Sequence, residues 1–274
     1  MISYNCALIP EQLTLVTISL HLSKHAFMEV HHSHHVAHKK KWKEYFLEFL
    51  MLFLAVFCGF LAEYQLEHKI EKDREEQFIS SLVSDLKDDT ISISKQIEYV
   101  KTGIIYFDSL SFLLQSPDLA RKHGESIYYT ARLGVRLTPL VNNNRTIDQL
   151  KNSGGFRLIH DQETSNRIMK YYSEFPELRK IEEIFSDENV AFKEVASKVM
   201  DQSVYRSQIN PDNSVARIPG NLRLLTYDLT TLNQLGFYAV QMNGSRTGIL
   251  QLLQKLKRSA EELLMYLEKE YHLK

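Results

Sequence analysis

The chain has 274 residues, of which 44% are hydrophobic and 24% are charged. This composition excludes a collagen, a disulfide-stabilised mini-protein and a wholly disordered chain. Its 33 Lys and Arg residues nearly balance 34 Asp and Glu residues, which gives a net charge of −1. A general nucleic-acid-binding protein needs a basic excess to neutralise phosphates, so we expect no nucleic acid among the partners.

The expected cytoplasmic tail, residues 1–44, has two parts. Residues 1–27 carry few charges and show no hydrophobic period, whereas residues 28–44 are rich in His and Lys. Two interpretations stay open for the first part: translation begins at Met28, or residues 1–27 are a genuine cytoplasmic extension. The second part contains imidazoles that could ligate Zn, Cu or Ni, namely His31, His32, His34, His35 and His38.

Strong metal sites place their ligands on a folded frame with supporting hydrogen bonds behind them, and these histidines have no Cys or Asp beside them in the sequence. We favour a polar, partly cationic flank that contacts anionic headgroups, with metal binding as the alternative. We expect no cofactor.

Residues 45–64 are predicted to form a transmembrane helix. Residues 49–62 carry no charge, and Phe, Leu and Val occupy every helical face instead of one stripe. Trp42 and Tyr64 flank this block as interfacial anchors do. The 23 residues from one to the other reach about 35 Å at ~1.5 Å per residue, enough to cross a bilayer. The alternative is a buried core helix, because 14 uncharged residues are short for a span.

The charge on the two flanks predicts the orientation. Residues 63–89 hold nine acids and four bases, whereas four lysines precede the helix: Lys39, Lys40, Lys41 and Lys43. By the positive-inside rule the N-terminus stays in the cytoplasm and the C-terminal domain is exported. Phe60 and Phe57 are too bulky for a signal-peptidase or lipoprotein site, which favours an uncleaved signal anchor in the bacterial inner membrane with a periplasmic domain.

The exported region is predicted to be helical. Residues 65–115 form a charged stalk and then the first bundle helix, in which Arg74 and Thr90 fill gaps in an apolar stripe. The stripe advances in steps of three and four along Leu66, Ile70, Phe78, Leu82, Leu86, Ile93, Ile97, Val100 and Ile104.

Residues 116–274 complete the domain with shorter helices and one long one. We expect a helix over residues 126–135, and another that begins at a Thr146/Gln149 capping box and ends at Gly154. Asp161 caps the next helix, which the Phe175-Pro176 pair kinks or splits. Residues 202–220 are predicted to be a loop.

A long last helix follows Asp228. Its apolar stripe consists of Leu232, Leu235, Ala239, Met242, Ile249, Leu253, Leu256, Leu263 and Leu267. Gly236, Gly244 and Gly248 either admit close helix contacts or mark a bend. No run alternates with period two, so the expected fold is all-α: a transmembrane helix that continues into the stalk helix, and an irregular antiparallel bundle.

The chain resembles an uncharacterised family of bacterial single-span membrane proteins. The resemblance covers most of residues 28–274 and is carried by a His/Lys-rich start, one span, a charged stalk and a TxxxLxxSGxxxLI segment before a Tyr171-Tyr172 pair. The matching positions of the segment are Thr146, Leu150, Ser153, Gly154, Leu158 and Ile159. The resemblance implies the topology and the helical fold, and it implies no activity.

No enzyme motif is present: the sequence has no Walker loop, G-x-S-x-G, H-E-x-x-H or paired Cys. Residues 142–155 are the best pocket candidate, because Arg145, hydroxyl groups and a Gly-Gly turn come together there; the alternative is a corner that only caps helices. In the span, Ala55 and Gly59 share a face with Glu48 and Glu63 and permit close helix approach. This face either pairs with a second copy or a partner helix, or its small residues are incidental.

We therefore expect a non-enzymatic interaction or scaffold protein, with the lipid bilayer, a second copy or another membrane protein as partners. The alternative is a ligand-sensing helical bundle that signals through its span by means of a partner protein. A third hypothesis is a subunit of an ion-coupled complex that uses Glu48.

Overall fold

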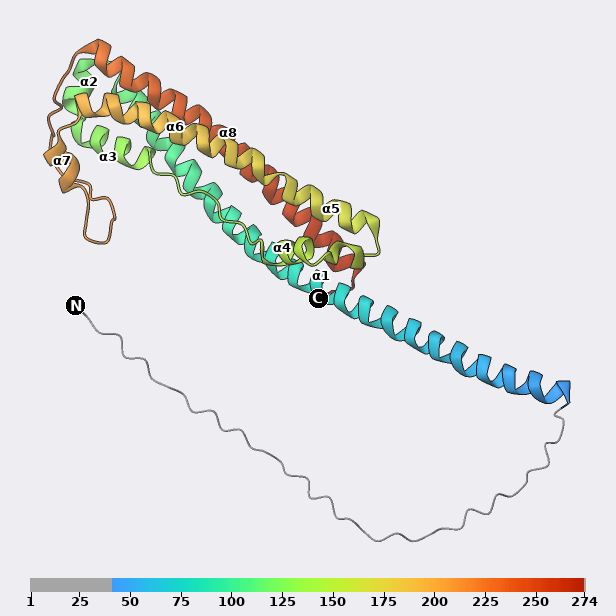
Figure 1. The fold of residues 1–274 in the computed structure, drawn as a ribbon. Coiled ribbons are helices and arrows are strands. Elements are labelled where there is room, and N and C mark those ends of the chain that lie inside the picture. The colour runs from blue at the N-terminus through green and yellow to red at the C-terminus, as the bar shows by residue number, and fades with distance from the viewer. Residues whose placement is uncertain (1–40, 274) are drawn as a thin grey trace, which may run out of the picture. The chain divides into compact units, whose positions relative to one another are not determined.

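The computed structural model describes residues 41–273 of the chain and is all-α (Figure 1). The described part contains no β-strand, only an isolated antiparallel bridge between Ile209 and Val215. The prediction of an all-α fold is therefore confirmed. The described residues divide between Cys58 and Gly59 into two units, and the bundle lies wholly in the second.

The first helix, α1 (Trp42–Leu113), is a single helix of 72 residues that covers both the predicted span and the first predicted bundle helix. Its N-terminal part contains a stretch that is long and apolar enough to cross a membrane. None of that stretch is buried in the described structure, so it is not a core helix of this fold. Residues 65–74 are likewise exposed, as expected of a solvated stalk, and burial on α1 begins at Glu75.

The core is built on α1, α6 (Phe175–Val199) and α8 (Leu229–Glu270), which lie side by side in Figure 1. Lys87 of α1 forms an ion pair with Glu268 of α8, at 2.8 Å. Further along α1, the carboxylate of Asp108 accepts a hydrogen bond of 2.6 Å from the amide of Asn243. The order of these two contacts makes α1 and α8 antiparallel.

Helix α6 runs parallel to α1 and antiparallel to α8. The ring of Phe107 on α1 packs edge-on against Phe185 and Phe192, with centroids 6.3 and 6.2 Å apart. Against α8, a Cβ atom added at Gly248 would lie 2.4 Å from the side chain of Ile181. Gly248 therefore admits a close helix contact without a break, and every residue of the predicted α8 stripe is buried.

The apolar stripe of α1 differs from the prediction at Leu66 and Ile70, which are exposed, and at its two gaps. Glu75 and Asp89 occupy them and are buried, whereas Arg74 is exposed and Thr90 is half-buried. The prediction placed Arg74 and Thr90 in the gaps because each lies four residues after an apolar member of the stripe, Ile70 or Leu86. The buried residue is the one beside it in each case. Both acids have hydrogen-bond partners that come from distant parts of the chain, which makes their burial tolerable.

Short helices connect the long ones. They are α2 (Pro117–Lys122), α3 (Gly124–Gly134), α4 (Arg145–Asn152), the 3-10 helix η1 (Gly155–Leu158), α5 (Gln162–Ser173) and α7 (Gln202–Ser207). The predicted caps Asp161 and Asp228 accept backbone N–H groups at the starts of α5 and α8. The split before Pro176 is also confirmed, with α5 and α6 as separate helices.

The prediction of a loop over residues 202–220 was wrong at its start, where α7 forms. Asp201 caps this helix by accepting the N–H of Ser203 at 2.7 Å. The cap is a local signal that the polar composition of the segment obscured.

Candidate functional site

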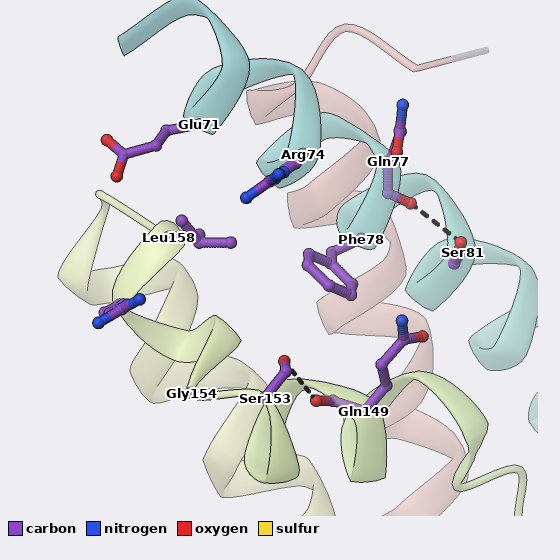
Figure 2. A pocket seen from close by; sticks show the side chains of 10 residues that line it. Glu71, Arg74, Gln77, Phe78, Ser81, Gln149, Ser153, Gly154 and Leu158 are labelled. Carbon is purple, nitrogen blue, oxygen red and sulfur yellow. Dashed lines mark hydrogen bonds between the residues drawn. The ribbon is translucent and has the colours of Figure 1, made fainter. Parts of the chain in front are cut away.

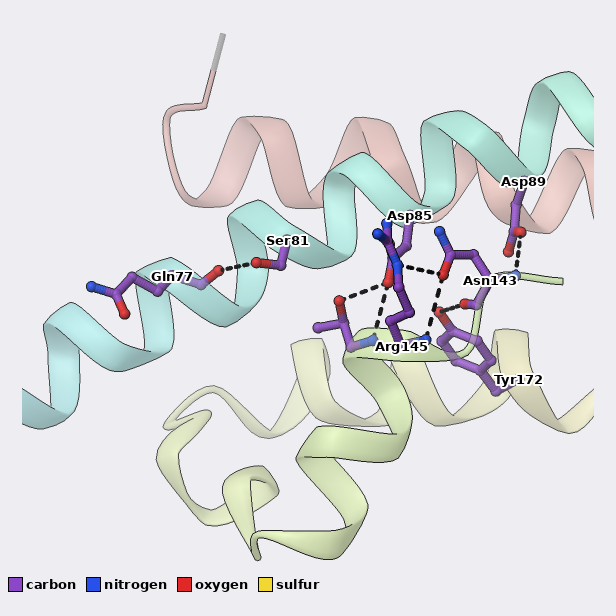
Figure 3. Close-up of polar contacts among 8 residues, drawn as sticks. Gln77, Ser81, Asp85, Asp89, Asn143, Arg145 and Tyr172 are labelled. Carbon is purple, nitrogen blue, oxygen red and sulfur yellow. Dashed lines mark hydrogen bonds and ion pairs between the residues drawn. The ribbon is translucent and has the colours of Figure 1, made fainter. Parts of the chain in front are cut away.

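A buried carboxylate, Asp85, joins α1 to the start of α4 (Figure 3). Its Oδ2 atom accepts the hydroxyl of Thr146 at 2.6 Å and the backbone N–H of Thr146 at 3.1 Å. Its Oδ1 atom accepts Nη2 of Arg145 at 2.8 Å. The charge-assisted bonds of this one side chain fix the first turn of α4 on α1.

The predicted capping box is wrong. α4 begins at Arg145, its N-cap Asn144 makes no side-chain capping bond, and the hydroxyl of Thr146 is bonded to Asp85. The physical reason is that a carboxylate from another helix satisfies the free N–H of the first turn, which a local cap would otherwise do. Gln149 is exposed and makes no such reciprocal bond.

Asp89, one turn further along α1, holds the turn before α4. It accepts the backbone N–H of Asn143 and the hydroxyl of Tyr171, both at 2.8 Å. Burial raises the pKa of Asp89, and burial together with the nearby Asp89 carboxylate raises the pKa of Tyr171. The Tyr172 hydroxyl donates to the carbonyl of Asn143 at 3.5 Å, so both tyrosines of the pair support this corner.

Beside this corner is a groove, named here the α1–α4 groove, of about 430 Å³. Figure 2 shows Arg74 and Phe78 of α1 on one side of the groove. On the other side are Gln149 of α4 and Ser153, the residue that follows this helix. Its lining consists of Glu71, Arg74, Gln77, Phe78, Ser81, Gln149, Ser153, Gly154, Arg157 and Leu158. The predicted pocket segment 142–155 thus supplies one wall, and α1 supplies a wall that the sequence did not indicate.

The charge of the groove favours an anion. Two guanidinium groups, from Arg74 and Arg157, face a single carboxylate, that of Glu71, so the lining carries a net charge of +1 (two minus one). A second hollow of about 290 Å³, which Asp85 and Arg145 help to line, shares Ser81 and Gln149 with the groove. Gly154 adopts a φ of +67°, which forms the predicted left-handed turn and leaves the groove wall free of a side chain there.

A second polar cluster surrounds Glu75, the other buried acid of the α1 stripe. Its Oε1 atom accepts the Tyr271 hydroxyl at 2.6 Å and the backbone N–H of His160 at 3.2 Å, and its Oε2 atom lies 3.0 Å from Nδ1 of His160. The pKa of His160 is raised by the hydrogen bond between its imidazole ring and the Glu75 carboxylate. Neither His160 nor Glu75 lies in a sequence motif, and their pairing depends on the tertiary fold alone.

Arg246 is the largest fully buried side chain of the described structure. Its Nη2 atom donates to the carbonyl of Gly134, the last residue of α3, at 2.9 Å, and to the carbonyl of Arg136, two residues further on. Its guanidinium lies 5.1 Å from the ring centroid of Phe185, and burial lowers its pKa to about 10. The predicted α8 stripe lacks an apolar residue between Met242 and Ile249, where Arg246 lies. This gap was the sequence signal that could have indicated a buried polar side chain.

The remaining predicted site residues are placed as follows. Ala55 and Gly59 are exposed, and a Cβ atom added at Gly59 would meet nothing within 4 Å. Their contact with another helix stays a prediction. Residues 1–40 lie outside the described part of the chain, and with them the candidate metal ligands His31, His32, His34, His35 and His38.

No family model, curated protein or solved structure matches this chain. The resemblance to a family of bacterial single-span membrane proteins therefore stays a prediction.

Proposed function

We propose that this chain is a single-pass inner-membrane protein whose helical domain, residues 65–274, is periplasmic and has a non-enzymatic interaction or scaffold role. The observation that carries the proposal is the complete exposure of the apolar stretch of α1. Such a surface is stable only when lipid or another apolar helix covers it. The lysines before it and the acids after it support an orientation with the N-terminus in the cytoplasm.

The chemistry of the bundle supports an interaction role over catalysis. Asp85 accepts three hydrogen bonds from α4, and Asp89 accepts one from the turn before α4 and one from Tyr171 of α5. Polar groups whose bonding capacity is taken up by the fold act as structural links. The long helices instead offer extended surfaces for a protein partner.

Membrane insertion can be tested with substitutions in the apolar stretch. The double variant Leu54→Arg/Phe57→Arg should release the protein from membranes at alkaline pH, because each central Arg costs about 2.5–3.5 kcal/mol. The matched control Leu54→Ile/Phe57→Leu should remain integrated. Retention of the arginine variant in the membrane fraction would contradict the span.

Orientation can be tested with single cysteines in a chain that carries Cys6→Ser and Cys58→Ser. A membrane-impermeant maleimide should label Lys151→Cys in intact cells and Lys41→Cys only after lysis. Both positions are exposed, so access across the membrane alone distinguishes them. The reverse labelling pattern would place the domain in the cytoplasm.

A ligand-sensing role is the second candidate, and the α1–α4 groove favours it. Its volume of about 430 Å³ and its two arginines suit a small anionic molecule. Purification of the full chain in mild detergent distinguishes the scaffold role from the ligand-sensing role. Co-purified membrane proteins support the scaffold, whereas a bound small molecule that is lost in Arg74→Gln/Arg157→Gln favours the sensor.

A further inference from the structure

Three side chains with metal-binding atoms meet beside the α1–α4 groove. His68 and Glu71 come from α1 and His160 follows η1, and the ligand atoms of all three lie within 4.8 Å of one another. The rings of His68 and His160 are nearly perpendicular, at 75°, with centroids 5.8 Å apart. All three residues are exposed, so an ion can reach them from solvent.

The helix and a buried carboxylate hold the three in place. His68 and Glu71 are three residues apart on α1, a spacing that puts them on one face. His160 is fixed by Glu75, which is only 7% exposed and bonds both the ring Nδ1 and the backbone N–H of His160. A histidine whose Nδ1–H donates to a carboxylate presents an unprotonated Nε2, the usual arrangement behind a metal-ligating imidazole.

We propose that His68, Glu71 and His160 bind a divalent transition-metal ion of the Zn²⁺ class, with Glu75 as the carboxylate that orients His160. Two imidazoles and one carboxylate suit Zn²⁺, whereas Mg²⁺ and Ca²⁺ prefer oxygen ligands alone. This inference is independent of the proposed scaffold role.

The geometry needs only small adjustments to close on an ion. Zinc bonds of about 2.0–2.1 Å put neighbouring ligand atoms of a tetrahedral site about 3.3 Å apart. The present separations are at most 4.8 Å, so with His160 held by Glu75, rotation of the exposed side chains of His68 and Glu71 would have to shorten them by about 1.5 Å at most. The fourth position stays open, and because Glu71 also lines the α1–α4 groove, a groove-bound anion could share the ion (Figure 2).

The test uses the full chain in mild detergent, without a polyhistidine tag. Alanine replaces His31, His32, His34, His35 and His38, so that the N-terminal cluster does not compete for metal. Co²⁺, followed by its visible absorption, is the probe, and Zn²⁺ should displace it. We expect one equivalent of Co²⁺ to bind with the intense bands of a low-coordinate site.

His68→Ala and His160→Ala should each abolish this spectrum, and Glu75→Gln should weaken binding about 10–100-fold. The matched control is His123→Ala, because His123 is an exposed histidine that makes no side-chain capping bond. Circular dichroism checks the fold, and His68 lies on the exposed part of α1, so its variant retains the bundle. The proposal is overturned if the parent binds no Co²⁺, or if His68→Ala binds it as tightly as His123→Ala does.

Discussion

The hydroxyl of Thr146 donates a hydrogen bond of 2.6 Å to the carboxylate of Asp85, across 61 positions of the sequence. The same carboxylate accepts the N–H of Thr146 and the guanidinium of Arg145. The start of α4 therefore depends on a residue in the middle of α1. This long-range cap holds α4, which forms one wall of the α1–α4 groove, against the buried face of α1.

Replacement of Asp85 by Ala should lower the free energy of unfolding of the bundle by about 2–3 kcal/mol, because charge-assisted bonds are lost and a buried N–H is left unpaired. Urea unfolding followed by circular dichroism measures this change. The control is Asp88→Ala, an exposed acid three residues further on α1. Equal effects of the two variants would show that Asp85 does not act as the cap.

Gly103 and Arg246 should show strong energetic coupling. A Cβ atom added at Gly103 would lie 1.7 Å from Nη1 of Arg246, so Gly103→Ala should destabilise the bundle by about 1–3 kcal/mol through overpacking. Arg246→Met in the same chain should remove most of that penalty, which a double-mutant cycle measures. Gly244→Ala is the control: nothing lies within 4 Å of its added Cβ, and the change should stabilise α8 by about 1 kcal/mol. Additive effects at Gly103 and Arg246 would argue against their contact.

Local and periodic signals account for what the sequence predicted correctly. Asp161 and Asp228 are caps that act within three residues, and the α8 stripe follows the helical repeat. The polar contacts of the site obey no such repeat. Asp85, Glu75 and Arg246 are charged residues in apolar stripes, and their partners lie 60 or more positions away. Such partners become neighbours only when the bundle forms. The sequence therefore shows a charged residue within an apolar stripe, but it does not show which group that residue bonds.

The pH dependence of stability should report on Asp89. Burial raises its pKa in the folded state, so above the unfolded value of about 3.9 the folded chain binds more protons than the unfolded chain. The free energy of unfolding contributed by this group therefore falls as the pH rises through the raised pKa. Asp89→Asn removes this dependence and keeps an oxygen that can accept the Tyr171 hydroxyl. In urea unfolding from about pH 4 to 7, the stability of the variant relative to the parent should rise with pH. A constant difference would show that Asp89 does not titrate in this range.

The small residues of the span predict helix pairing in the membrane. Gly59 has no side chain to hold a neighbouring helix away, and Cys58 beside it is a free, exposed thiol. With Cys6 replaced by Ser, mild oxidation of membranes should cross-link a second copy through Cys58. Gly59→Leu should strongly reduce this product, because a bulky side chain separates the helices, whereas the volume-conserving control Leu61→Ile should not. Unchanged cross-linking in Gly59→Leu would mean that Ala55 and Gly59 do not form the contact face.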